Sequence, residues 1–372
     1  MNTNLVPQVD PTPIPGPPWL FHGLLVFTFI LHALFMNVAL GGTMLAWFAQ
    51  LGSGGRAGDP RTTLAQRMMG INAYAISLAI TTGVAPLLFV QVLYQQYFYS
   101  GTILVGWAWL LFLVMLTLGY YAAYAYKFRG APARGAGGTG WLAVASVMFF
   151  LIAMVHVAVN LVHSQPDRWA VFADNPWAVL ADPAYFPRLF HFVLAALGVS
   201  GLVAVWWAVR QAARGIDLAQ NTAIARYAWT WVLGTTLLQV ADGFLLLLVL
   251  PRPVLLGLMR GGVATIVPLT LAILLGIGLL MMLARVSNPV EHRGTVNGTV
   301  GAMALTIAIM SITRHQVRAL YLEPHTSGQA LATASQWGNF ALFALLLVVA
   351  LATVAFMVRH VFRNPATGED AA

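Results

Sequence analysis

The chain has 372 residues, of which 59% are apolar and only 8% are charged. Soluble proteins carry about 25% charged residues, so this composition excludes a soluble domain and indicates a membrane protein. We assign the net charge of +8 to membrane topology and not to nucleic-acid binding. Cysteine is absent, which excludes disulfides, thiolate-held iron–sulfur clusters and covalently attached c-type haem.

Apolar segments long enough to cross a bilayer, about 20 residues each, recur along the chain. They are preceded by a polar, Pro-rich stretch over 1–18 without the basic segment of a signal peptide, which predicts an extended periplasmic arm. The sixth apolar segment is interrupted by Asp242 and followed at once by two prolines. The nine predicted spans are 19–50, 69–95, 102–126, 141–163, 187–209, 227–250, 262–284, 295–317 and 335–358.

The sequence therefore predicts an all-α, polytopic transmembrane helical bundle over 19–358, without a second domain. A cytoplasmic tail over 359–372 follows, predicted to be disordered from Asn364. Most of the 19 basic residues fall in the inner segments if the N-terminus lies outside, so the charges predict an N-out, C-in orientation. Three aspartates in the longest outer loop, 164–186, agree with that side. We expect a multi-pass protein of a bacterial inner membrane.

Histidines cluster at one depth of the predicted bundle. An imidazole is costly in hydrocarbon unless it faces the protein interior and has a partner, and it is also the usual axial ligand of non-covalent haem b. A single interfacial histidine is more often a snorkelling or hydrogen-bonded residue than a ligand, and we apply that interpretation to His22, His292, His325 and His360. His325 is placed in the loop beyond span eight. Seven of the nine histidines fall in the outer half: His22, His32, His156, His163, His191, His315 and His325.

His32, about 15 Å deeper than His22 at 1.5 Å per residue, and His191 are the strongest candidates for haem-iron ligands. His156 and His163 are seven residues apart and share a helix face, which either contacts a cofactor or bonds a neighbouring helix. His163 is the third candidate iron ligand.

Two further polar features lie within or beside the spans. Asp242 either takes part in proton transfer or ends the sixth span at the surface. Arg314, His315 and Arg318 form one predicted helix face, which either binds haem propionates or anchors the helix at the interface.

The run His32-Ala33-Leu34-Phe35-Met36-Asn37-Val38-Ala39-Leu40-Gly41 resembles the first helix of subunit I of the cytochrome bd-type quinol oxidases. In that family a haem-ligand histidine is followed by the same Leu-Phe and Leu-Gly spacing. Arg188-Leu189-Phe190-His191 is similar to the family's basic residue three before the histidine that ligates low-spin haem b. Shorter similarities occur at Gly70-Ile71-Asn72, Thr82-Gly83, Asn160 with Gln165-Pro166, and Arg318.

The sequence also departs from that family. Span three, Gly101 to Tyr126, contains none of the family's glutamates, and the outer loop between spans six and seven is reduced to 251–262. The family's methionine partner of the span-five histidine is missing from Pro268 to Leu280. The resemblance therefore implies a subunit that has lost oxygen reduction, in which His163 or His156 replaces the methionine opposite His191.

We expect a haem b-containing membrane subunit of a respiratory oxidoreductase complex. It would pass electrons between the quinone pool and a periplasmic cytochrome c or oxidoreductase partner, beside other membrane subunits in the lipid bilayer, with quinone as a further ligand and no nucleic acid. Two alternatives remain: a haem-free anchor of such a complex, and a proton or solute transporter that uses Asp242, His32 and the Arg314–Arg318 face.

Overall fold

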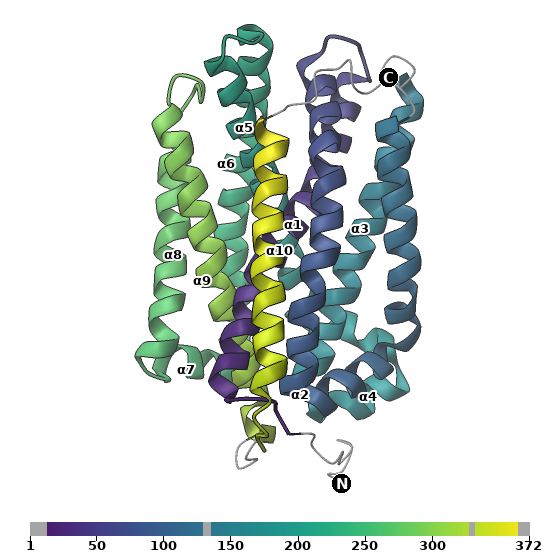
Figure 1. The fold of residues 1–372 in the computed structure, drawn as a ribbon, viewed down its shortest axis with the longest axis vertical. Helices are drawn as coiled ribbons and strands as arrows, with labels where there is room; N and C mark the ends of the chain where they lie inside the picture. Colours follow the sequence, from purple (N-terminus) through teal and green to yellow (C-terminus); the bar gives the residue numbers. More distant parts are fainter. Residues whose placement is uncertain (1–12, 129–134, 327–331, 364–372) are drawn as a thin grey trace.

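The computed structural model describes residues 13–128, 135–326 and 332–363, and nearly all of them are helical (Figure 1). The first twelve residues of the predicted arm and the predicted tail from Asn364 lie outside the described residues. The long helices are α1 Pro18–Ser53, α2 Pro60–Phe128, α3 Gly135–Ser164, α5 Tyr185–Ala213, α6 Leu218–Leu248, α8 Val263–Ala284, α9 Arg293–Thr326 and α10 Trp337–Arg363.

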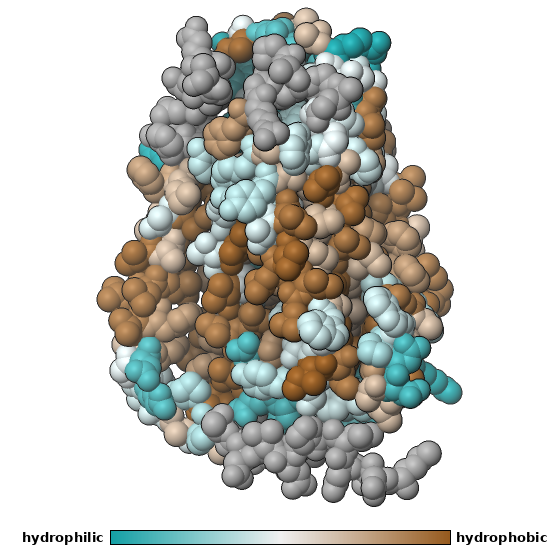
Figure 2. All heavy atoms as spheres, turned by 90° about the vertical axis from the view of Figure 1, so that its right-hand side faces the viewer, coloured by the Kyte–Doolittle hydropathy of each residue, from teal (hydrophilic) through white to brown (hydrophobic). Residues whose placement is uncertain are grey.

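These eight helices of the described chain are long and apolar enough to cross a membrane. On the face shown in Figure 2, apolar side chains cover the middle of the molecule, and polar patches lie near both ends. Helices satisfy their own backbone hydrogen bonds, which hydrocarbon requires. The predicted class, an all-α polytopic membrane bundle, is confirmed.

Helix α2 contains two of the predicted spans. Its backbone leaves helical geometry at Tyr94 and Gly106, and Gly106 adopts a φ of 33°, which glycine tolerates best. The Lys127 ammonium, near the end of α2, lies 5.4 Å from the Tyr74 ring near its beginning. The second leg of α2 therefore runs back along the first. Spans two and three are therefore antiparallel legs of one broken helix, and the described residues contain nine membrane-length segments.

Helix α1 is held in the middle of the bundle by small and polar residues. An added Cβ at Gly41 would lie 1.9 Å from the backbone oxygen of Ala196, so α1 and α5 touch backbone to backbone. The Ser200 hydroxyl of α5 donates to the Asn37 carbonyl at 3.1 Å. Small residues and interhelical hydrogen bonds of this kind stabilise membrane helix pairs.

The segments that precede α1 and α10 meet at one end of the bundle. Ile14 and Thr333 form a parallel bridge, in which the Ile14 amide donates to the Ala332 carbonyl at 2.8 Å. Both helices therefore start at this end, called here the N-terminal end, and α10 finishes at the opposite one (Figure 1). An odd number of crossings follows, whereas the N-out, C-in orientation stays a prediction.

Two predicted connections between spans contain short helices, and one residue predicted to lie in a loop belongs to a helix. The segment 164–186 contains the 3-10 helices η1 Pro166–Arg168 and η2 Pro176–Ala181 around α4 Trp169–Asp174, and 251–262 contains α7 Arg252–Arg260. His325 lies in the last turn of α9, not in a loop. Hydropathy predicts only the part of a helix that lies inside the bilayer, and a helix can continue beyond that part where packing stabilises it. The last turn of α9 is stabilised in this way, because the Tyr97 hydroxyl donates to the His325 carbonyl at 3.0 Å.

Candidate functional site

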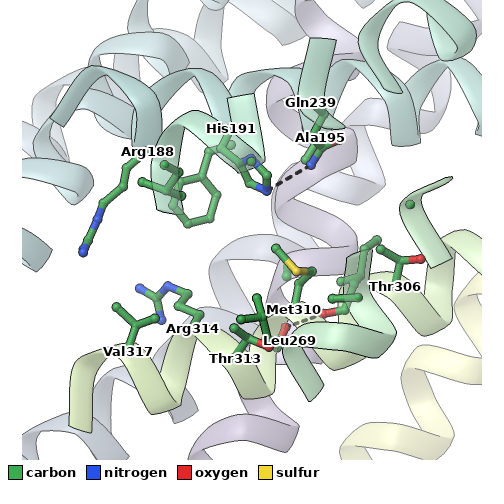
Figure 3. Close-up of a pocket in the computed structure, with 18 of the residues that line it drawn as sticks. Arg188, His191, Ala195, Gln239, Leu269, Thr306, Met310, Thr313, Arg314 and Val317 are labelled. Atoms are coloured by element: carbon green, nitrogen blue, oxygen red, sulfur yellow. Dashed lines mark hydrogen bonds between the residues drawn. The ribbon is translucent and has the colours of Figure 1, made fainter. Parts of the chain in front are cut away.

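A cavity of about 270 Å³ lies between α5 and α6 on one side and α8 and α9 on the other, with α1 behind it. Its lining is mostly apolar and includes a few polar side chains, among them Arg188, His191 and Arg314 (Figure 3). Ligand sites in proteins combine an apolar lining with a few placed polar groups. This cavity is the candidate site.

His191 is the imidazole of this cavity. It lines the wall formed by α5, and its Nε2 lies 3.5 Å from the Gln239 amide nitrogen of α6. Its Nδ1 lies 3.2 Å from a carboxylate oxygen of Asp242, also on α6. The predicted candidate His191 thus has one ring nitrogen held by a carboxylate and the other on the cavity side.

Three arginines line the same cavity: Arg188 from α5, and Arg314 and Arg318 from α9. The Arg188 Nη1 donates to the Asn160 side-chain oxygen at 3.0 Å, and the guanidinium of Arg314 lies 4.3 Å from the Phe29 ring.

No ion pair joins any of the three to an acid within the described residues. Arg188 Nη2 and Arg318 Nε are buried without a hydrogen-bond partner. Guanidinium groups buried in a membrane protein are costly without a counter-charge. The cluster therefore suits an anionic group.

Met310 also lines the cavity, and Figure 3 shows its thioether between α9 and the wall that carries His191. Met310 was not among the predicted site residues, because the methionine of the bd-type oxidases was expected in span seven and Met310 lies in span eight. A signal was present: Met310, Arg314 and Arg318 are spaced by four residues, which places them on one helix face.

The deeply placed His32 does not line this cavity. It faces the first leg of α2, where its Nδ1 lies 2.9 Å from the Ala79 carbonyl. An added Cβ at Gly83 would lie 2.9 Å from the His32 ring, so this glycine makes room for the imidazole. The role of His32 as an iron ligand stays a prediction.

His163 and His156 are not brought to the cavity lining either, so the structure does not place them opposite His191. The His163 ring is buried against α2, where a Cβ at Gly101 would lie 2.2 Å from its Cδ2. The His156 ring is exposed and packs 5.7 Å from the Trp109 ring. Both rings therefore pack against α2 and not against the helices that carry His191 and the arginines.

Arg314, His315 and Arg318, predicted to form one helix face, do not all point into the cavity. Both arginines line the cavity, whereas the His315 ring turns to α1 and lies 5.1 Å from the ring of His22. Consecutive helix residues point about 100° apart, which separates His315 from the arginines.

Asp242 does not end its span at the surface. Helix α6 continues to Leu248, and Asp242 is 9% exposed. That alternative of the sequence analysis is wrong, since the aspartate is buried and has an imidazole as its partner. A proton-transfer role for Asp242 stays a prediction.

No protein-family model matches the sequence, and no curated protein matches it. Among solved structures, the chain is similar to that of the bd oxidase from Geobacillus thermodenitrificans, with a TM-score of 0.76 and 13% sequence identity. The similarity covers 95% of this chain and 100% of that chain. At this identity the comparison shows the fold alone. The bd-like architecture expected from the sequences around His32 and His191 is confirmed.

Proposed function

We propose that this bd-oxidase-like membrane protein binds haem b in the cavity beside His191 and carries electrons as a subunit of a respiratory complex. The observation that carries the proposal is that one largely apolar cavity is lined by a histidine and three arginines, of which Arg318 is buried and the other two are half-buried. None of the three arginines pairs with an acid within the described residues. Haem b combines an apolar ring, an iron that accepts imidazole, and two propionate carboxylates. The donor set of the cavity fits each part.

In this proposal His191 would hold the haem iron through its imidazole. Arg188, Arg314 and Arg318 bind the propionates, because charge-assisted bonds between guanidinium and carboxylate are strong and often bidentate. Met310 would be the second residue to hold the iron, since thioether and imidazole together hold the haem iron of some cytochromes. The bound group would supply one-electron transfer, and the protein supplies binding, orientation and exclusion of water.

The donor and acceptor of the electrons are part of the proposal. The arginines lie towards the N-terminal end of the bundle, which the charge distribution predicts to be outside. We therefore place a periplasmic redox partner, such as a cytochrome c or an oxidoreductase subunit, on that side, and the quinone pool within the membrane. Span three, Gly101 to Tyr126, contains no acid, and we propose no oxygen reduction.

A reduced-minus-oxidised visible spectrum of the purified complex, with a pyridine haemochrome assay, tests the proposal. We expect a b-type signal in the wild type and its loss in His191→Ala. The matched control is His292→Ala, because the His292 ring bonds the Asn288 carbonyl in the loop between α8 and α9, away from the cavity. A wild-type complex without haem would contradict the proposal and favour the haem-free anchor.

A further inference from the structure

The carboxylate of Asp242 lies behind His191, on the side away from the cavity. Its oxygen is 3.2 Å from His191 Nδ1, it is buried, and it does not line the cavity that His191 lines. Within the described part of the chain, His191 is the polar side chain that this carboxylate contacts. The carboxylate therefore acts on the cavity through the imidazole.

Asp242 and Gln239, the two polar neighbours of the His191 ring, indicate which ring nitrogen carries the proton. An ionised carboxylate accepts hydrogen bonds and cannot donate them, and an amide nitrogen donates and cannot accept. Asp242 therefore requires a proton on Nδ1, and the Gln239 amide nitrogen, 3.5 Å from Nε2, requires a lone pair there. That contact is at the long limit for a hydrogen bond, so a ligand can displace it at little cost.

The backbone holds this arrangement rigidly. Gln239 and Asp242 are three residues apart on α6 and face the same way. Helices α5 and α6 pack closely at the pair and further along: an added Cβ at Gly243 would lie 3.6 Å from the His191 ring, and one at Gly198 would lie 3.1 Å from the Thr235 hydroxyl. The carboxylate and the imidazole come from two tightly packed helices, so their separation is set by the fold.

We propose that Asp242 is a positioning residue for the haem ligand His191. It holds the Nδ1 proton, turns the Nε2 lone pair to the cavity, and lowers the midpoint potential of iron bound there. A carboxylate that accepts a hydrogen bond from a metal-binding histidine fixes the tautomer of the ring and makes the histidine a stronger donor to the metal. A buried negative charge also favours ferric over ferrous iron, which has one positive charge fewer. This inference rests on the proposed function.

Two variants separate charge from orientation. Asp242→Asn keeps an oxygen that accepts from Nδ1 but removes the charge, and Asp242→Leu removes both. The matched control is Glu291→Gln, which removes a carboxylate that accepts from Asn288 in the loop between α8 and α9. Haem content and a redox titration at one fixed pH are measured on each purified complex.

We expect Asp242→Asn to retain haem and to have a higher midpoint potential. At a fixed potential its ratio of ferric to ferrous haem should fall about tenfold, which is about 59 mV for one electron. Asp242→Leu should also lose haem, Asp242→Glu should return towards the wild-type potential, and Glu291→Gln should match the wild type. A purely structural role would leave the potential of Asp242→Asn unchanged, and that result would overturn the inference while the haem assignment stands.

A second measurement does not depend on haem. Nitrogen-15 NMR of labelled histidine in haem-depleted protein, with His191 identified by the signal lost in His191→Ala, reports which ring nitrogen carries the proton. We expect Nδ1 to be protonated in the wild type and the Nε2 tautomer to gain population in Asp242→Leu. If no preparation binds haem but the tautomer follows Asp242, the proposed function fails and the positioning role is supported. An unchanged tautomer overturns the positioning role.

Discussion

Gly41 marks the closest approach of α1 and α5, and adding one methyl group there should separate the two helices. A Cβ at Gly41 would lie 1.9 Å from the Ala196 oxygen and 2.1 Å from its carbonyl carbon. Carbon and oxygen atoms in contact are normally about 3.3 Å apart, so the helices must move by about 1.4 Å. Both sides of the clash are backbone, so a rotamer change cannot relieve it.

Overpacking of this kind costs typically about 1–3 kcal/mol. The movement would also break the hydrogen bond from Ser200 to the Asn37 carbonyl, and interhelical hydrogen bonds in membranes contribute about 0.6 kcal/mol on average. We therefore expect Gly41→Ala to lower the free energy of unfolding by roughly 2–4 kcal/mol. Haem content should fall with it, because Asn37 and α5 both line the cavity.

The matched control is Gly23→Ala in the same helix. An added Cβ there meets nothing within 4 Å, and alanine is favoured over glycine in a helix interior by about 0.5–1 kcal/mol. Thermal unfolding of the detergent-purified proteins should give a lower Tm for Gly41→Ala and an equal or higher Tm for Gly23→Ala. If Gly41→Ala were as stable as the wild type, the close backbone contact between α1 and α5 would be refuted.

Three further predictions concern single side chains. Arg318→Gln should weaken haem retention about tenfold or more, since a hydrogen bond to a charged group contributes about 1.5–3 kcal/mol. The haem content of the complex after dilution measures this, and unchanged retention would argue against propionate binding by Arg318. Met310→Leu keeps the side-chain size but removes the thioether. The Soret and α bands of the reduced complex should therefore shift if Met310 ligates iron, and identical spectra would exclude Met310 as a ligand. Asp59→Asn should lower Tm at neutral pH, because the Arg61 side chain that bonds Asp59 lowers the pKa of that carboxyl. A lowered pKa stabilises the fold above the ordinary value of 3.8, and the contribution is lost as the pH falls through the folded-state pKa. The Tm difference between Asp59→Asn and the wild type should therefore shrink in acid, and a constant difference from pH 7 to pH 3 would contradict the assignment.

The amino-acid sequence by itself determined that the protein lies in a lipid bilayer and that its fold class is an all-α bundle. Hydrocarbon demands apolar segments of about 20 residues with internally satisfied backbones, so the composition and spacing of these segments predict a helical bundle. The three-residue separation of Arg188 and His191 also placed both on one helix face, and both line the cavity. Such local inferences hold because 3.6 residues per turn govern every α-helix.

The tertiary structure alone decided which faces meet. Periodicity gives the angle between side chains within one helix, but the rotation and tilt of each helix depend on packing against its neighbours. His163 and His156 therefore turned to other surroundings although their spacing suited a common site, and Met310 entered the cavity from α9. The contact between His191 and Asp242 joins residues 51 positions apart in sequence, and it depends on the close packing of α5 on α6.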